Sequence, residues 1–275
     1  MNKLAIGVLD SGYEGLTLFE ELVRAYRYET FIYINDIHNL PYEGQTGEAI
    51  NKAVQKNIDI LQSQGIKMLV VVSDLIVEHC QELLNSLEIP VINIVSAIIE
   101  YVNNNFEQKD LILLIKQEVI KANLYQKNFR YNHLFSINST ELTKIILNKQ
   151  IKTSKSFFTS KEVFKNHYRR KADLLIISES YLLKLKTEID EYVDVLEMIS
   201  LPEVFQVQIN HFEDLLEKKG KRKTMIISDL GKKEFYQQAY WLAGKYAYCQ
   251  KSKMLIPNFG EQKNKDSHSK ANDDE

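Results

Sequence analysis

Residues 4–17, LAIGVLDSGYEGLT, contain a short apolar run followed directly by Asp10, Ser11 and Gly12. A continuous run of Ile, Leu and Val without polar alternation is typical of a strand that is buried on both faces. The next segment, Leu16–Tyr26, has the spacing of an amphipathic helix. This stretch therefore predicts a buried strand, a turn and a helix, the repeating unit of an α/β protein.

The same pattern recurs along most of the chain. Further apolar runs predict buried strands at Phe31–Ile34, Met68–Val72, Val91–Val95, Leu111–Ile115, Leu174–Ile177 and Met225–Ile227. Longer segments with helical spacing lie between them, among them Gly47–Gln64, Leu75–Leu87 and Phe235–Tyr246. The alternation predicts an α/β fold with parallel sheets.

The composition argues against several classes of protein. The 275 residues carry 35 Lys and Arg against 37 Asp and Glu, and this net charge of −2 argues against a general nucleic-acid binder. No apolar stretch reaches the roughly 18 residues of a membrane span, so we expect a cytoplasmic protein. The two cysteines, Cys80 and Cys249, are too few for a disulfide scaffold or a four-thiolate zinc site. The six histidines lack metal-ligand spacing, so no metal site is expected.

A weak repeat indicates two similar halves. Asp10 and Ser73 both follow apolar runs, and the same separation of 63 positions recurs between Lys116 and Glu179. Polar residues at the carboxyl ends of parallel strands commonly line a ligand crevice. The last residues, 261–275, contain almost no apolar side chains and are expected to form a disordered tail.

Segments in fixed order resemble the glutamate racemase family. IGVLDSGYEGLT (6–17) resembles the family pattern GVFDSGxGGLT, and YINDIHNLPYEGQT (33–46) resembles YxGDxxxxPYG. KMLVVVSDLIVE (67–78) lies where the family has a strand before Cys-Asn-Thr, and ADLLIISESYLL (172–183) lies where it has DTLILGCTHYPLL. IISDLGKKEFYQQAYWLAG (226–244) is similar to the closing segment of the family. The resemblance covers nearly the whole chain.

This resemblance implies two similar α/β domains with parallel sheets and an active-site cleft between them. The first domain would comprise residues 1–96 with 205–260, and the second residues 97–204. The family needs no cofactor and no metal, because one cysteine serves each face of the glutamate α-carbon. Such proton transfer requires one ionised and one protonated group on opposite faces, and a thiol can fill both roles.

The chain departs from the family at both cysteine positions. The first holds Ser73, with Asp74 beside it, and a serine hydroxyl needs its own base before it can act. The second holds Glu179, followed by Ser180 in place of a threonine and Tyr181 in place of the assisting histidine. The two cysteines of this chain align with neither position and fall outside the predicted cleft.

Two further family positions are changed in the second half. The assisting glutamate of the family aligns with Leu147, and Glu141 lies close enough in the sequence to be the alternative. The threonines of the GTxATIxS stretch correspond to Lys116 and Val119.

Four polar or turn positions of the family are retained: Asp10, Ser11, Pro41 and Tyr42, whereas Glu14 replaces a glycine. We expect the retained residues, together with Asp74 and Ser180, to line the substrate site. An acid at a strand end can orient an ammonium group. Asp-Ser-Gly at a strand-to-helix turn can equally serve as a helix cap, and both interpretations stay open.

The leading hypothesis is a glutamate-racemase-like protein that has lost both catalytic cysteines and acts as a non-catalytic binding or regulatory pseudoenzyme. The alternative is a cofactor-independent glutamate or aspartate racemase, or a related isomerase or lyase of peptidoglycan-precursor metabolism, that uses Glu179 with Ser73 and Asp10. Clustered acids would repel an anionic substrate, with only Lys116 to compensate. A third hypothesis is a pseudoenzyme that pairs with an active racemase. The expected partners are a small amino-acid ligand and a homodimer or heteromer, with no membrane and no nucleic acid.

Overall fold

The computed structural model describes residues 4–37, 39, 42, 44–244 and 247–257. The tail predicted at 261–275 and the retained Pro41 lie outside these residues. No helix in the described ranges is both long enough and apolar enough to cross a membrane.

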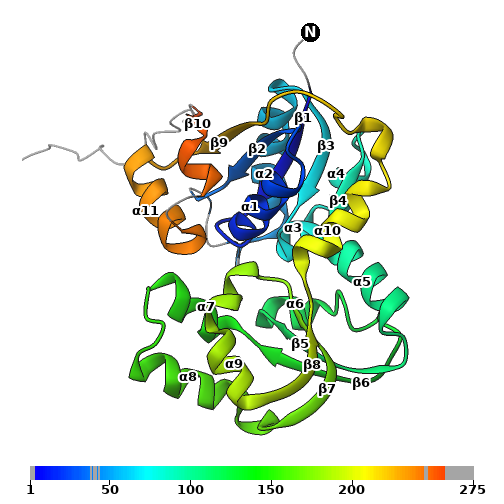
Figure 1. The fold of residues 1–275 in the computed structure, drawn as a ribbon, viewed down its shortest axis with the longest axis vertical. Helices are drawn as coiled ribbons and strands as arrows, with labels where there is room; N and C mark the ends of the chain where they lie inside the picture. The colour runs from blue at the N-terminus through cyan, green and yellow to red at the C-terminus, as the bar shows by residue number, and fades with distance from the viewer. Residues whose placement is uncertain (1–3, 38, 40–41, 43, 245–246, 258–275) are drawn as a thin grey trace, which may run out of the picture.

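The described chain forms two parallel sheets, which Figure 1 shows one above the other. The larger sheet contains, in spatial order, β10 (Lys253–Leu255), β9 (Lys223–Ser228), β2 (Thr30–Asn35), β1 (Ala5–Asp10), β3 (Ile66–Val71) and β4 (Val91–Asn93). The smaller sheet contains β6 (Tyr131–Asn138), β5 (Lys109–Ile115), β7 (Arg170–Ile177) and β8 (Val193–Met198). Every pairing is parallel, which confirms the predicted α/β class.

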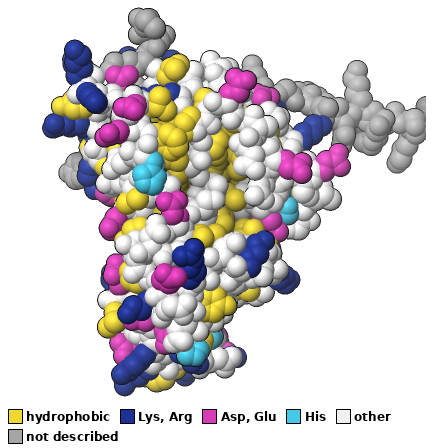
Figure 2. Space-filling model, turned by 90° about the vertical axis from the view of Figure 1, so that its right-hand side faces the viewer, with side chains coloured by type: hydrophobic (Ala, Val, Ile, Leu, Met, Phe, Trp, Pro, Cys, Tyr) yellow, Lys and Arg dark blue, Asp and Glu magenta, His cyan; other side chains and the backbone are white. Residues whose placement is uncertain are grey.

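Helices connect the strands throughout. The α-helices are α1 (Leu16–Ala25), α2 (Gly47–Ser63), α3 (Asp74–His79), α4 (Gln81–Asn85), α5 (Ile94–Asn105), α6 (Gln117–Ala122), α7 (Thr140–Leu147), α8 (Ser154–Phe164), α9 (Lys186–Tyr192), α10 (Leu201–Asn210) and α11 (Lys232–Ala243). Short 3₁₀ segments are η1 (Lys165–His167), η2 (Ser180–Leu185), η3 (Glu213–Leu215) and η4 (Tyr248–Lys251). Acidic and basic side chains are interspersed over the face shown in Figure 2, as the nearly neutral composition predicts.

The structure corrects two predicted elements. The single helix expected at Leu75–Leu87 is two short helices, because Cys80 leaves the helical conformation with φ −121° and ψ 21°. The strand expected at Val91–Val95 ends at Asn93, whose side chain accepts a hydrogen bond from the N–H of Ser96 at 2.9 Å and so begins α5.

Three strands were not predicted at all. β6 and β8 form the two edges of the smaller sheet, and each mixes exposed polar residues with apolar ones. β10 has only three residues. A search for continuous apolar runs finds strands that are buried on both faces and misses edge strands of this kind.

The chain passes from the larger sheet to the smaller one through α5 and returns through α10, and these two helices pack against each other. The predicted domain limits at 97 and 205 therefore fall inside two helices. The division into residues 1–96 with 205–260 and 97–204 stays a prediction.

The turn between β1 and α1 requires glycine at position 15. A Cβ atom built on Gly15 would lie 2.1 Å from Cγ2 of Val72, which follows β3. The φ of Gly15 is −94°, so lack of space and not backbone conformation excludes a side chain. The N–H of Gly15 also donates to Oδ2 of Asp10 at 2.8 Å, which fixes the turn against the end of β1.

We expect Gly15→Ala to lower the free energy of unfolding by about 2 kcal/mol, because the added methyl group overlaps Val72. The cost should be smaller in a Val72→Ala background, where Cγ2 is gone. Gly231→Ala is the matched control, since a Cβ there meets nothing within 4 Å. Urea denaturation measures all three changes, and an equal cost in both Val72 backgrounds would contradict the packing argument.

Candidate functional site

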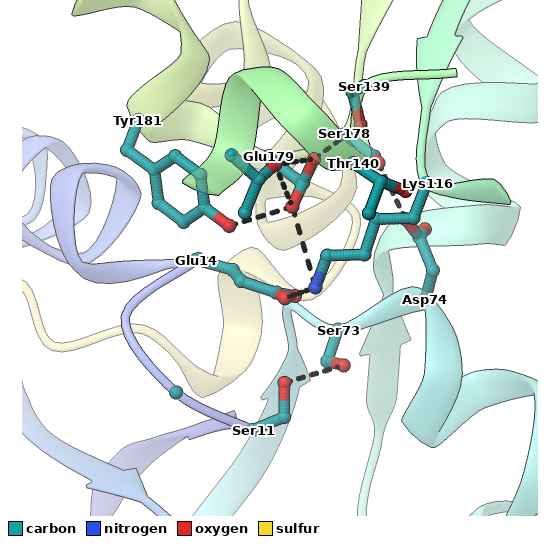
Figure 3. Close-up of polar contacts among 12 residues, drawn as sticks. Ser11, Glu14, Ser73, Asp74, Lys116, Ser139, Thr140, Ser178, Glu179 and Tyr181 are labelled. Atoms are coloured by element: carbon teal, nitrogen blue, oxygen red, sulfur yellow. Dashed lines mark hydrogen bonds and ion pairs between the residues drawn. The ribbon is translucent and has the colours of Figure 1, made fainter. Parts of the chain in front are cut away.

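Polar side chains gather where four strands end, between the two sheets (Figure 3). Asp10 ends β1 and Ser73 follows β3, and these two strands are paired. Lys116 follows β5 and Glu179 follows β7, which are also paired. The 63-residue spacing in the sequence thus reflects equivalent strand ends in the two sheets.

Lys116 lies between two carboxylates and joins the two sheets. Its ammonium group bonds Glu14, from the turn after β1, and lies 3.4 Å from Oε1 of Glu179 (Figure 3). Only 11% of the Lys116 side chain, 13% of that of Glu14 and 2% of that of Glu179 is exposed. We call these three residues the cleft bridge. The positive charge therefore compensates acids of this protein in the place where a substrate carboxylate was expected.

The Glu179 carboxylate is surrounded by hydrogen-bond donors. The hydroxyl of Ser139 donates to Oε2 at 2.8 Å, that of Thr143 approaches both oxygens at 3.0 and 3.1 Å, and that of Tyr181 donates to Oε1 at 2.7 Å. With Lys116 added, four side chains contact this carboxylate. A base held in this way has its lone pairs directed at protein groups and away from a substrate.

The two residues expected near an assisting glutamate do not reach this carboxylate. Leu147 is 41% exposed, and Glu141 forms an exposed pair with Lys144. The same helix instead presents Thr143 to Glu179, because the turn that begins α7 faces the cleft. The alignment of the family's assisting glutamate with Leu147, or with Glu141, stays a prediction, and neither side chain contacts Glu179 in this structure.

Asp10 is engaged by its own turn. Its carboxylate accepts the N–H groups of Gly12 at 3.2 Å and Gly15 at 2.8 Å, and the hydroxyl of Tyr33 at 2.5 Å. Burial raises the pKa of this carboxyl, and these three hydrogen bonds oppose the rise. The N-cap of α1 is Gly15, and no side chain caps this helix. Asp10 therefore holds the turn in place without being the helix cap itself.

Ser11 and Ser73 bond each other. The hydroxyl of Ser11 donates to Oγ of Ser73 at 3.0 Å, and both residues are buried. In the described part of the chain neither serine is hydrogen-bonded to a carboxylate or an imidazole, so neither hydroxyl has a base that could activate it.

Asp74 and Ser180 form further contacts between the two halves of the chain. Asp74 accepts the hydroxyls of Ser178, at 2.5 Å, and Tyr125. Burial raises the pKa of Asp74 to about 6, although both hydrogen bonds oppose the shift. Ser180 donates to the carbonyl of Glu14 at 2.5 Å. Sequence reasoning did not single out Ser139, Thr143, Tyr125 or Ser178, because their roles depend on tertiary contacts.

Tyr42 lies outside this cluster. Its hydroxyl donates to Oδ2 of Asp36 at 2.7 Å, and Asn57 donates to the same oxygen at 3.0 Å. Tyr42 is buried, and its retention is explained by this contact near the end of β2.

Both cysteines are inert by their surroundings. Cys80 and Cys249 are fully buried, and burial raises the pKa of the Cys80 thiol to about 12 and that of Cys249 also upward. No group of three His, Cys, Asp or Glu side chains within the described ranges could hold a metal ion.

Four cavities of the described residues lie away from the cleft bridge. These cavities, of 450 to 990 Å³, are lined by residues of other regions, and neither Asp10, Ser73 nor Glu179 lines any of them. Asp10, Ser73 and Glu179 are each 1% exposed or less. The cleft is filled by its own side chains.

Comparison with known proteins identifies the relatives of this chain. No protein-family model matches it. A glutamate racemase from Exiguobacterium sibiricum is 32% identical over 132 residues, 48% of each chain, and one from Fusobacterium nucleatum is 22% identical over 199 residues, 69% of this chain and 74% of that protein. For several such relatives the match spans about half of their length.

Solved structures agree over a longer range. Glutamate racemase from Thermus thermophilus in complex with β-chloro-D-alanine superposes with a TM-score of 0.79 at 18% identity, covering 93% of this chain and 97% of that one. The enzyme from Francisella tularensis in complex with D-glutamate gives 0.78 at 20% identity, covering 94% and 98%. The chain is glutamate racemase-like and has the fold of these enzymes.

The cleft bridge predicts a pH dependence of stability. Burial raises the pKa of Glu14 from 4.5 to about 8, Lys116 opposes the rise, and Glu179 and Asp10 add to it. The folded protein therefore keeps a proton on Glu14 that the unfolded chain releases, so the contribution of Glu14 to the free energy of unfolding is greatest below about pH 4.5 and is lost as the pH rises through about 8. Asp74 contributes the same sign between about 3.8 and 6.

We expect Glu14→Gln to reduce the loss of unfolding free energy that occurs above about pH 6. The loss that is due to Asp74, at lower pH, should remain. Chemical denaturation at about pH 5 and about pH 8 measures the difference between variant and parent. An unchanged slope above pH 6 would show that Glu14 titrates as an ordinary exposed acid.

Removing the lysine should be costly. Lys116→Met leaves two buried carboxylates without a cation, and we expect a loss of about 3 kcal/mol near pH 8, less near pH 5 where Glu14 takes up a proton. Lys186→Met, which breaks an exposed pair with Asp190, is the control and should cost under about 1 kcal/mol. Equal losses for the two variants, measured by denaturation, would rule out a buried bridge.

Proposed function

We propose that this glutamate racemase-like protein is a pseudoenzyme that has lost both catalytic cysteines and serves as a binding or regulatory protein. The carrying observation is the state of Glu179, which aligns with the second cysteine. It is bonded by Ser139, Thr143 and Tyr181 and is paired with Lys116. A group so occupied is a structural acceptor.

The other half of the reaction also lacks a suitable group. Ser73 aligns with the first cysteine, and its partner in the described part of the chain is the hydroxyl of Ser11. Exchange of the α-proton between two faces needs a second acid or base. Two buried serines bonded to each other supply neither an ionised group nor a base.

The cleft bridge also disfavours an amino-acid substrate. The α-carboxylate of glutamate would compete with Glu14 and Glu179 for a single ammonium group, that of Lys116. Binding would require separation of contacts that join the two sheets, including the bond from Ser180 to the carbonyl of Glu14.

The partner follows from this proposal. With the cleft filled, we propose a protein partner, either a second copy of this chain or an active racemase subunit of peptidoglycan-precursor metabolism in the cytoplasm. An amino-acid ligand is the alternative, and stabilisation by glutamate would favour it.

The decisive test is exchange of the α-proton. Purified protein is incubated with L- or D-glutamate, and separately with L- or D-aspartate, in heavy water, and loss of the α-proton signal is followed by NMR. We expect no loss above the protein-free rate, and the same result for Glu179→Gln. The Thermus thermophilus racemase serves as the positive control.

Two results of these experiments would change the proposal. Exchange that Glu179→Gln abolishes would identify Glu179 as a catalytic base and overturn the pseudoenzyme proposal. A rise in the melting temperature with glutamate but no exchange would assign the cleft to amino-acid binding.

A further inference from the structure

A large cavity lies at the opposite end of the larger sheet from the cleft, where its strands begin. Its volume is 990 Å³. Its lining includes the first residue of each of four neighbouring strands: Ala5 of β1, Thr30 of β2, Lys223 of β9 and Lys253 of β10. We call it the amino-end groove.

Strand register places the floor of this groove on one face of the sheet. Thr30 pairs with Lys223, Ile32 pairs with Met225, and Met225 pairs with Lys253. Residues opposite each other in a parallel sheet, and residues two apart along a strand, point to the same face. Met225, which is partly exposed, therefore gives the groove an apolar floor with lysines beside it, whereas Ile32 is only 3% exposed.

The groove has this shape because the sheet extends past its covering helix. α2 packs on β1, β2 and β3, and Gln64, which follows α2, lines the groove. β9 and β10 continue the sheet beyond that helix. The part of the face that α2 leaves uncovered is the floor of the groove.

The lining is strongly cationic. Five basic side chains line it and no acidic one does, namely Lys221, Arg222, Lys223, Lys251 and Lys253. Arg222 is held in place, donating to the carbonyl of Val23 at 2.6 Å and lying 4.3 Å from the centre of the Tyr248 ring. None of the four lysines forms an ion pair with another described residue.

Two buried acids adjoin the lining and have partners of their own. Glu20, which is 4% exposed, accepts the N–H groups of Tyr248 and Cys249. Glu29, which precedes β2, is 1% exposed, and its carboxylate is paired with Lys67 and accepts the N–H of Glu217. In a chain whose net charge is −2, five unbalanced cations in one groove form a local field that attracts anions.

We propose that the amino-end groove binds a nucleoside di- or triphosphate. Lysine and arginine are the side chains that bind phosphate oxygens, and several phosphates match several cations. Met225 gives the base an apolar surface, and the volume lies in the range of small-molecule sites. The five cations line one cavity, which favours a nucleotide over a nucleic-acid strand.

Calorimetry with the full-length protein at low ionic strength tests this site, with adenosine, AMP, ADP and ATP as probes. We expect affinity to rise with the number of phosphates and to fall as salt is added. Lys223→Gln with Lys253→Gln should weaken ADP binding by about tenfold or more. Lys127→Gln, an exposed lysine of the other half, is the matched control and should leave ADP binding unchanged.

A second double variant tests the site without changing any residue of the strands. Lys221→Glu with Lys251→Glu changes residues outside β9 and β10 and should abolish ADP binding while the melting temperature stays near that of the parent. Three results would each overturn the proposal. They are the absence of ADP and ATP binding by the parent protein, ADP binding by both double variants that equals that of the parent, and tight binding of a single-stranded oligonucleotide without ADP binding. The outcome does not depend on whether the cleft is catalytic.

Discussion

A single ammonium group determines the state of the cleft. Lys116, at the end of β5, bonds Glu14 from the larger sheet and lies 3.4 Å from Glu179 in the smaller one. Three ionisable side chains that are nearly removed from water must satisfy one another, because a buried charge or polar group without a partner is costly. This requirement holds the two sheets together and leaves no unpaired cation in the bridge to receive a substrate carboxylate.

The remaining polar groups of the cleft follow from this arrangement. Each strand end that would face a ligand in an open crevice faces another part of the protein: Asp10 its own turn, Ser73 the hydroxyl of Ser11, and Asp74 the hydroxyl of Ser178. The chain thus keeps a racemase fold while its strand ends act as structural contacts. The groove at the other end of the larger sheet has the opposite character, with cations that no described acid neutralises.

Much of the fold could be predicted because it is local in the sequence. The buried strands are continuous apolar runs in the sequence, and the turn after β1 is fixed by Asp10 and Gly15, which are only five positions apart. The edge strands β6 and β8 could not be found in this way. The cleft bridge joins Glu14 and Lys116, which are 102 positions apart in the sequence. Thr143 contacts Glu179 only because of the way α7 is oriented in the fold, which the sequence does not reveal. One signal was available: Glu14 and Lys116 replace uncharged residues of the family pattern with opposite charges, as expected for a new ion pair.

The most direct test of the closed cleft is the NMR signal of the Lys116 side-chain ammonium group in ¹⁵N-labelled protein, assigned by its loss in Lys116→Met. A lysine held between Glu14 and Glu179 exchanges its protons with water far more slowly than exposed lysines do. The account predicts a persistent signal that does not move when L- or D-glutamate is added. A signal that exchanges as fast as those of exposed lysines, or that shifts with glutamate, would show that the cleft is open and able to bind a ligand.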